Sequence, residues 1–377
     1  MDAERGGGEA MVRNAIVVGG GIAGHAAALA LLRAGIAVTV LEQRPDESGL
    51  GSFLRLNPNG MDAVAALDLL DRVTEVSFPV HHVERLELDG EVLVRRPLAD
   101  PVPGRGLGAR FITWADLAGA LRDEAARRGA IVRHEARVVD AVATDDGVRA
   151  LLADGGGVDA DVLIGADGMR SAIRTVIDPA APAPEYRGSR TVYGYAPAAD
   201  VPPAPAQLRS YRGPAHWLAQ LDDPDTGEIW FFTSVKTPEP LPSPGPTTDQ
   251  WRADLLRNWD HDDIPARIIR AATRIRASDD HALHHLPHWH TDRMVVIGDA
   301  AHAAPPGSEQ GGCLALEDAV VLGQCLRDLD LPSALSRFEQ ERRERVEKIL
   351  AMATGRAEIG DPRWTHEHHL TWDQPIR

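Results

Sequence analysis

The sequence predicts an α/β protein with an inserted antiparallel β-sheet domain and C-terminal helices. Three observations lead to this prediction. Residues 14–44 combine a short apolar strand, a glycine-rich turn, a helix rich in Ala and Leu, and a second strand. From residue 179 the composition becomes rich in Pro and includes short aromatic strands, which is typical of an antiparallel sheet. From Met294 onward, a buried strand and two helices return to the α/β pattern.

The first βαβ unit carries a dinucleotide-binding motif. Gly19, Gly21 and Gly24 form G-x-G-x-x-G between the expected strand and helix. The first Gly of this pattern allows a tight turn, the second lets the backbone approach a pyrophosphate, and the third lets helix and strand pack closely. The helix N-terminus offers N–H groups to phosphate, and Glu42, which ends the second strand, would accept from ribose hydroxyls. The motif predicts a Rossmann-like dinucleotide site and does not distinguish FAD from NAD.

The chain is expected to alternate between two domains. The Asp89-Gly90 turn with alternating residues on both sides predicts a β-hairpin, and Thr113 is suited to cap a helix at 114–128. The nucleotide domain is expected to consist of residues 12–80, 105–178 and 287–360, the last with a C-terminal helix. The substrate domain is expected to consist of the hairpin 81–104 and the β-sheet segment 179–286.

The middle domain is expected to contain strands at 191–195, 216–221 and 229–235. Successive side chains of a strand point to opposite faces, so the strand at 216–221 would place His216 on one face of the sheet and Trp217 on the other. An aromatic-rich pocket would suit a planar substrate. His216 is a candidate general base for a phenol, and the alternative is a solvated or core histidine.

Composition excludes several classes of function. The net charge of −16 argues against nucleic acid as a partner. Cys313 and Cys325 form no C-x-x-C, so we expect neither a disulfide nor a thiolate metal site. The five histidines within 281–290 lack a metal-binding spacing, so we expect residues 281–290 to form a loop without a metal site. The N-terminal segment lacks a signal-peptide core, and no run of about 18 apolar residues occurs, which predicts a cytoplasmic protein without a membrane span.

Two further stretches carry a family resemblance. DVLIGADGMRSAIR at 161–174 and GDAAHAAPPGSEQGGCLALEDA at 298–319 resemble signatures of the class A flavoprotein monooxygenases, the para-hydroxybenzoate hydroxylase-like group. The pattern at 310–323 is similar to the urate and salicylate hydroxylase branch. The resemblance implies an FAD-binding GR2-type Rossmann-like domain, FAD as cofactor and NAD(P)H as a transient co-substrate without a nucleotide domain of its own.

The resemblance also implies which residues contact the cofactor. Asp299, after a buried strand, would accept from ribityl hydroxyls, and the helix that begins near Gln310 would favour negative charge at the flavin N1/O2 region. Pro306 would stiffen the loop beside the flavin. The expected cofactor-binding residues are Gly19, Gly21, Ile22, Ala23, Gly24, Glu42, Gln43, Arg44, Arg55, Val138, Asp167, Gly168, Asp299, Pro306, Gln310, Gly311, Gly312 and Cys313.

The sequence departs from the family at four positions. Trp114 stands where the family often has Arg, and Glu309 stands where its G-Q-G-G begins with Gly. A negative charge at residue 309 would disfavour a reduced, anionic flavin unless it turns to solvent. The urate hydroxylase pattern has an Arg near His216 and a Tyr near Trp230, so we do not expect urate as the substrate.

The sequence therefore predicts an FAD monooxygenase, a monomer or homodimer, that uses NAD(P)H and O₂ to hydroxylate a small aromatic or polycyclic substrate. Its Ala, Arg, Pro and Gly content suggests bacterial specialised metabolism. Epoxidation and Baeyer–Villiger oxidation use the same flavin and remain alternatives. Trp114 and Glu309 leave open a non-catalytic flavin-fold carrier of a ligand. An NAD-dependent dehydrogenase would be colourless and would leave the Gly298-Asp299 motif unexplained.

Overall fold

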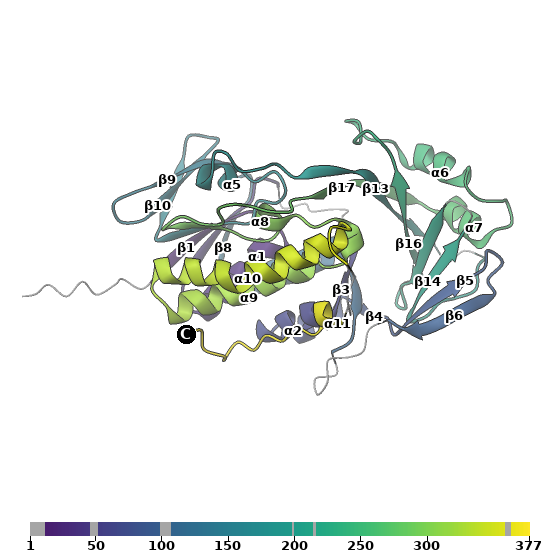
Figure 1. Ribbon diagram of the computed structural model, residues 1–377, viewed down its shortest axis with the longest axis horizontal. Helices are drawn as coiled ribbons and strands as arrows, with labels where there is room; N and C mark the ends of the chain where they lie inside the picture. Colours follow the sequence, from purple (N-terminus) through teal and green to yellow (C-terminus); the bar gives the residue numbers. More distant parts are fainter. Residues whose placement is uncertain (1–11, 46–51, 99–106, 198–199, 214–215, 359–362) are drawn as a thin grey trace, which may run out of the picture.

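The computed structural model describes residues 12–45, 52–98, 107–197, 200–213, 216–358 and 363–377. A parallel sheet with its helices forms one part, and a seven-stranded sheet with two helices forms the other (Figure 1). The long strands β13 (Glu185–Ala196) and β17 (Arg274–Ala282) run between the two parts. The predicted α/β class with an inserted sheet and C-terminal helices is confirmed.

The parallel sheet lies at the centre of the first part. Its strands, in spatial order, are β18 (Met294–Val296), β12 (Val162–Gly165), β1 (Asn14–Val18), β2 (Ala37–Leu41) and β8 (Ile131–Arg133). The inner strands are largely apolar and mostly buried, because both faces of the sheet are covered. The helices that pack on α1 (Ile22–Arg33) are α4 (Trp114–Arg127) and α9 (Gly311–Asp328), and α10 (Leu331–Ala353) packs on α9.

Two small antiparallel sheets complete this part. One consists of β11 (Gly157–Ala160), β10 (Val148–Leu152) and β9 (Val138–Ala143), and the other of β3 (Phe53–Leu56), β7 (Arg110–Thr113) and β4 (Phe78–Pro79). The shorter helices are α2 (Pro58–Ala66), α3 (Leu70–Glu75), α5 (Ala172–Ile177), α8 (Asp299–His302), the 3₁₀ turn η1 (Pro306–Ser308) and α11 (Arg363–His366). None of the helices in the described ranges is both long and apolar enough to cross a membrane.

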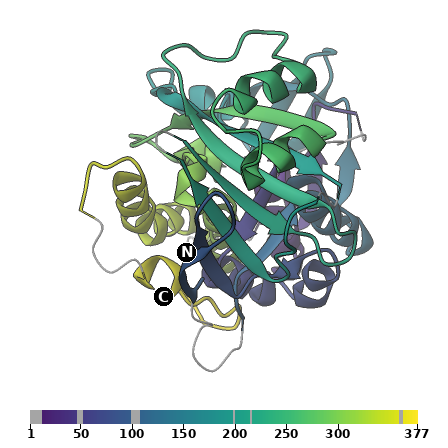
Figure 2. The same ribbon diagram turned by 90° about the vertical axis from the view of Figure 1, so that its right-hand side faces the viewer.

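The seven-stranded sheet has the order β17-β13-β16-β15-β14-β5-β6. Its remaining strands are β16 (Ile229–Lys236), β15 (Trp217–Asp222), β14 (Gln207–Arg212), β5 (His82–Leu86) and β6 (Val92–Pro97). Neighbouring strands are antiparallel except β14 and β5, which are parallel. Helices α6 (Thr248–Leu256) and α7 (Ile264–Ala271) cover its outer face (Figure 2).

The side chains on the two faces of this sheet belong to two separate hydrophobic cores, because successive side chains of a strand point to opposite faces. Leu218 and Phe231 pack under α6 and α7, whereas Ala219 and Trp230 face the aromatic side chain of Phe53 from β3. The sequence did not reveal β14 or β17. The residues of β17, RIRASDDHA, are too polar to predict a strand by themselves. The strand forms because β13 supplies its hydrogen-bond partners. The expected loop at 281–290 is therefore wrong for His281, which lies in β17.

Candidate active site

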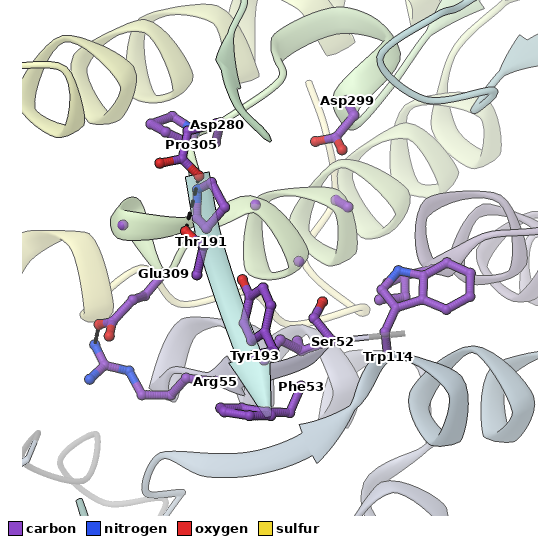
Figure 3. A pocket seen from close by; sticks show the side chains of 18 of the residues that line it. Ser52, Phe53, Arg55, Trp114, Thr191, Tyr193, Asp280, Asp299, Pro305 and Glu309 are labelled. Carbon is purple, nitrogen blue, oxygen red and sulfur yellow. Dashed lines mark hydrogen bonds and ion pairs between the residues drawn. The ribbon is translucent and has the colours of Figure 1, made fainter. Parts of the chain in front are cut away.

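A cavity of about 570 Å³ lies between the parallel-sheet part and the seven-stranded sheet (Figure 3). Its lining comes from both parts of the chain. The first part supplies Gly21 and Gly168 from turns and Asp299 from the start of α8, and the seven-stranded sheet supplies Tyr193 and Asp280. The cavity therefore joins the expected nucleotide site to the expected substrate domain.

The glycine-rich loop forms one end of this cavity. Gly19 has φ +104°, and a Cβ there would lie 2.4 Å from the Ala166 carbonyl oxygen, so only Gly fits. The carboxylate of Glu42 accepts hydrogen bonds from the Gly20 N–H (2.6 Å) and the Arg44 N–H (2.8 Å), which hold this loop against the end of β2. No side chain caps the N-terminus of α1, so its N–H groups are available to an anionic ligand.

Asp299 has the environment expected of a ligand-binding carboxylate. Gly298, at φ +56°, turns the chain after β18, and its N–H donates to the Asp318 carboxylate (2.9 Å). The Asp299 side chain opens into the cavity, and no donor from the described residues pairs with it. The side chain is exposed to the cavity, and desolvation by the surrounding protein atoms raises the pKa of Asp299. Such a carboxylate fits a polyhydroxyl chain that supplies the missing donors.

A buried charge network positions Asp299 from behind. Asp318 of α9 holds Gly298, and it also accepts from His302 (2.6 Å) and from Arg342 of α10 (2.8 Å). Arg342 also pairs with Glu317 (2.7 Å). Burial alone would raise the pKa values of Glu317 and Asp318, but the nearby cationic side chains outweigh it and lower both.

The N-terminus of α9 presents backbone rather than side chains to the cavity. Gly311 and Gly312 line it, together with Pro306. Gln310 turns away and its side-chain oxygen accepts from Asn59 (2.9 Å). Cys313 is buried and packs against Gly60, and burial raises its pKa to about 12. The side chains of Gln310 and Cys313 therefore support the loop and lie outside the lining.

Other expected cofactor residues lie away from the lining. Asp167 accepts from the Ser171 hydroxyl (2.5 Å) and the Ala172 N–H (2.7 Å) and thereby holds the start of α5, while the neighbouring Gly168 lines the cavity. Of the first βαβ unit, Gly21, Ile22 and Ala23 line the cavity. The members of that unit and its neighbours outside the lining are Gly19, Gly24, Glu42, Gln43, Arg44 and Val138. The Ala136 N–H donates to the Glu42 carbonyl (2.8 Å), so the segment that leads to Val138 lies beside the end of β2.

The charge that Glu309 adds is compensated. Its carboxylate forms an ion pair with the Arg55 guanidinium, and both side chains line the cavity (Figure 3). The backbone of Glu309 is left-handed, at φ +53°, a conformation that favours Gly. The Asn57 side chain donates to its carbonyl (2.8 Å), which stabilises this turn.

Comparisons with known proteins agree with this geometry. A family model described as an FAD binding domain matches residues 13–353. The 3-amino-4-hydroxybenzoate 2-monooxygenase of Streptomyces platensis is 33% identical over 94% of this chain and 88% of that protein. The aurachin C monooxygenase/isomerase of Stigmatella aurantiaca is 30% identical over 92% and 89%. The structure of Klebsiella pneumoniae HpxO with FAD and uric acid has a TM-score of 0.80 at 28% identity, covering 91% and 87%.

The chain belongs to the class A FAD-dependent aromatic monooxygenases. The residues present fit FAD, because the uncapped α1, the unpartnered Asp299 carboxylate and the open backbone at Gly311 lie around one cavity. The resemblance inferred from the motifs is confirmed, and so are the cofactor and the enzyme class. The family removes the NAD-dependent dehydrogenase from consideration.

The substrate side of this monooxygenase is an aromatic wall. The ring of Phe53 meets Tyr193 edge to face at 5.4 Å between centroids, and Trp217 meets Phe232 in the same way at 5.4 Å. Burial, with a smaller contribution from Asp280, raises the pKa of Tyr193 well above its usual value, so its hydroxyl stays protonated. Such rings suit a planar substrate.

His216 lies outside this wall. It immediately precedes β15 and is not among the lining residues, whereas Trp217 is. Side chains alternate along a strand, so the residue before Trp217 is directed to the opposite face. A general base at His216 is therefore not supported by its position. Sequence reasoning also missed several lining residues, among them Phe53, Tyr193 and Asp280, of which Tyr193 had a signal in its aromatic strand.

Trp114 also lines the cavity, beside the glycine-rich loop. The nearest atom to a Cβ built at Gly21 is a ring carbon of Trp114, at 3.6 Å. Trp114 begins α4, and the N–H of Asp116 donates to the Thr113 hydroxyl (3.0 Å), which confirms Thr113 as the cap. The indole thus takes an apolar place where the family often has a cation.

Proposed function

We propose that this protein is a single-component monooxygenase that hydroxylates a small aromatic or polycyclic substrate with FAD, NAD(P)H and O₂. The observation that carries the proposal is the continuity of one cavity. It extends from the glycine-rich loop and Asp299 to the aromatic face of the seven-stranded sheet. A cofactor held at the first end and a planar substrate held against the second would meet in the same enclosed space.

The chain offers a contact for each part of FAD. The loop at Gly21 and the α1 N-terminus would hold the diphosphate, and Glu42 would hold the adenosine ribose. Asp299 would accept from the ribityl chain, and the backbone N–H groups at Gly311 and Gly312 would face the ring system. The chemistry that bound FAD supplies is acceptance of a hydride and activation of O₂.

The protein side chains orient the substrate and exclude water. The apolar rings of Phe53, Trp217 and Phe232 cover the substrate end. Tyr193 holds its proton, so it can donate a hydrogen bond to a substrate oxygen or nitrogen. No histidine belongs to the lining formed by the described residues, so the proposal assigns no histidine base.

The names of relatives show the range of chemistry that this fold supports. They include a 3-amino-4-hydroxybenzoate 2-monooxygenase, an aurachin C monooxygenase/isomerase and a 6-hydroxynicotinate 3-monooxygenase. We place the present protein in bacterial specialised metabolism, in the cytoplasm, as a monomer or homodimer. Epoxidation, Baeyer–Villiger oxidation and ligand carriage are the alternatives that an experiment must separate.

The test begins with the absorbance spectrum of the purified protein. Flavin bands near roughly 370 and 450 nm should bleach with NAD(P)H under nitrogen and return in air. A panel of phenols and hydroxylated bicyclic compounds is then screened for faster NAD(P)H oxidation, and products formed under isotopically labelled O₂ are analysed by mass and by connectivity. One labelled oxygen on an aromatic carbon supports hydroxylation. An epoxide or a ring ester supports the alternative flavin reactions, and a flavin that NAD(P)H never bleaches supports a carrier.

A further inference from the structure

We propose that Asp280 makes the cavity selective for aromatic substrates that carry a neutral or cationic N–H or O–H donor, and selective against aromatic carboxylates. This inference rests on the proposed function, because it names the substrate class of the same cavity. It concerns a residue that the sequence motifs did not indicate. Asp280 lies in β17, at the substrate end (Figure 3).

The sheet register places Asp280 among the substrate-side residues. Thr191 pairs with Ser234 across β13 and β16, and Tyr193 pairs with Phe232 two positions further along. These four residues line the cavity, so they share one face of the sheet. Asp280 on the adjacent β17 is 7% exposed and lines the same cavity. Its carboxylate is therefore buried and close to the aromatic wall.

Two hydroxyl groups fix the orientation of this carboxylate. One oxygen accepts from Ser189 (2.6 Å) and the other from Thr191 (2.9 Å). A carboxylate has about four lone-pair positions, so capacity for further donors remains. A substrate N–H or O–H can use that capacity, and a cationic N–H gains additional Coulomb attraction. A substrate carboxylate brings only acceptors and a second negative charge.

The described lining contains no free cation that would reverse this preference. Its charged residues are Arg55, Asp280, Asp299 and Glu309. Arg55 is already paired with Glu309. The Arg190 guanidinium lies close to Asp279, the neighbour of Asp280, at 3.5 Å, and Arg190 is not among the lining residues. Like charges in a buried site repel more strongly than in water.

The experiment compares three probes that differ in one substituent: meta-hydroxybenzylamine, meta-hydroxybenzamide and meta-hydroxybenzoate. Near neutral pH they are cationic, neutral and anionic. Dissociation constants are measured on FAD-loaded protein from flavin absorbance changes and by calorimetry, which does not depend on the flavin. The variant is Asp280→Asn. The matched control is Asp279→Asn, which removes the same charge from the adjacent residue, outside the lining.

We expect the amine and the amide to bind about tenfold or more tightly than the benzoate. Asp280→Asn should bring the three affinities to within about threefold of one another, whereas Asp279→Asn should retain the wild-type order. Melting temperature and FAD content verify that both variants fold. The inference is overturned if the benzoate binds as tightly as the amine, if Asp280→Asn leaves the order unchanged, or if neither donor probe binds.

The two proposals fail in different ways. NAD(P)H-dependent bleaching and product formation are recorded on the same samples. Hydroxylation without charge selectivity contradicts the role of Asp280 and leaves the monooxygenase in place. Charge-selective binding without any turnover contradicts the proposed function and supports a selective carrier.

Discussion

Arg55 and Glu309 form an ion pair on the wall of the cavity, although they lie on separate segments, β3 and the turn that precedes α9. The side chain of Arg55 is 11% exposed and that of Glu309 is 34% exposed, so solvent screens the pair only in part. The pair explains how this chain tolerates an acidic residue where the family often has Gly. It also uses the one cation in the described lining.

Release of Arg55 should change which ligands bind. In Glu309→Gln the backbone turn is kept and the Arg55 guanidinium loses its partner. We expect the affinity for meta-hydroxybenzoate to rise about threefold to tenfold, because an anion can then pair with Arg55. Calorimetric titration checks this. The double variant Arg55→Met with Glu309→Gln should return the affinity to the wild-type value, and an unchanged Glu309→Gln would show that Arg55 does not reach the ligand.

The glycines of the first motif should respond differently to a methyl group. At Gly24 a Cβ would lie 1.8 Å from the Gly19 carbonyl oxygen, which belongs to the backbone and cannot rotate away as a flexible side chain would. Gly24→Ala should therefore destabilise the fold by about 3 kcal/mol or more. At Gly21 the nearest atom, in Trp114, is 3.6 Å away, so Gly21→Ala should fold normally. It should weaken FAD binding about tenfold or more, because the methyl group occupies the cavity.

Thermal melts and FAD titration of the apoprotein separate these two effects. Gly119 of α4 is the matched control, because a Cβ there meets nothing within 4 Å. Gly119→Ala should stabilise the protein by about 0.5–1 kcal/mol and leave FAD affinity unchanged. A Gly21→Ala protein that binds FAD like the wild type would argue against a diphosphate at this loop.

Arg342 should be essential for stability. It is fully buried and pairs with Glu317 (2.7 Å) and Asp318 (2.8 Å), which are also fully buried. Arg342→Met leaves these carboxylates with fewer cationic partners, and we expect a loss of about 3–5 kcal/mol in the free energy of unfolding. Urea denaturation measures it. Arg337→Met, which removes a half-exposed pair with Glu341, should cost at most about 0.5 kcal/mol, and equal costs for both variants would contradict the role of the network.

Mild acid should weaken the attachment of the C-terminal segment. Burial lowers the pKa values of His366 and His368 to about 4, with further lowering by nearby Arg side chains. Below about pH 6.5 the unfolded chain therefore binds protons that the folded chain does not, so stability falls as pH falls. We expect the free energy of unfolding to fall by about 1–3 kcal/mol per pH unit as the pH is lowered from about 6 to about 4.5.

The urea midpoint is measured across that range for the wild type and for the double variant His366→Gln with His368→Gln. The variant should show a smaller pH dependence. His261→Gln, at an exposed position, serves as the control and should retain the wild-type slope. A double variant with the full wild-type slope would assign the acid sensitivity to other groups.

Local patterns in the sequence were sufficient for the nucleotide domain. The βαβ unit, the Asp167-Gly168 turn and the Gly298-Asp299 turn each depend on residues that are adjacent in the chain. Glycine spacing and apolar runs report such local geometry directly. The positions of Gln310 and Cys313 could not be predicted as well, because both lie near Gly311 but turn their side chains into the protein interior.

The substrate side depended on contacts between distant segments. His216 and Trp217 are neighbours in the sequence, yet only Trp217 lines the cavity, since successive side chains of a strand point to opposite faces. Asp280 was hidden in a polar stretch that becomes a strand only when β13 pairs with it. The sequence by itself determined the fold class through local patterns, and the resemblance of its motifs to a known family indicated the cofactor and the enzyme class. Only the tertiary structure decided which side chains meet in the cavity, because strand register and the packing of Phe53 against the sheet bring together residues far apart in the chain.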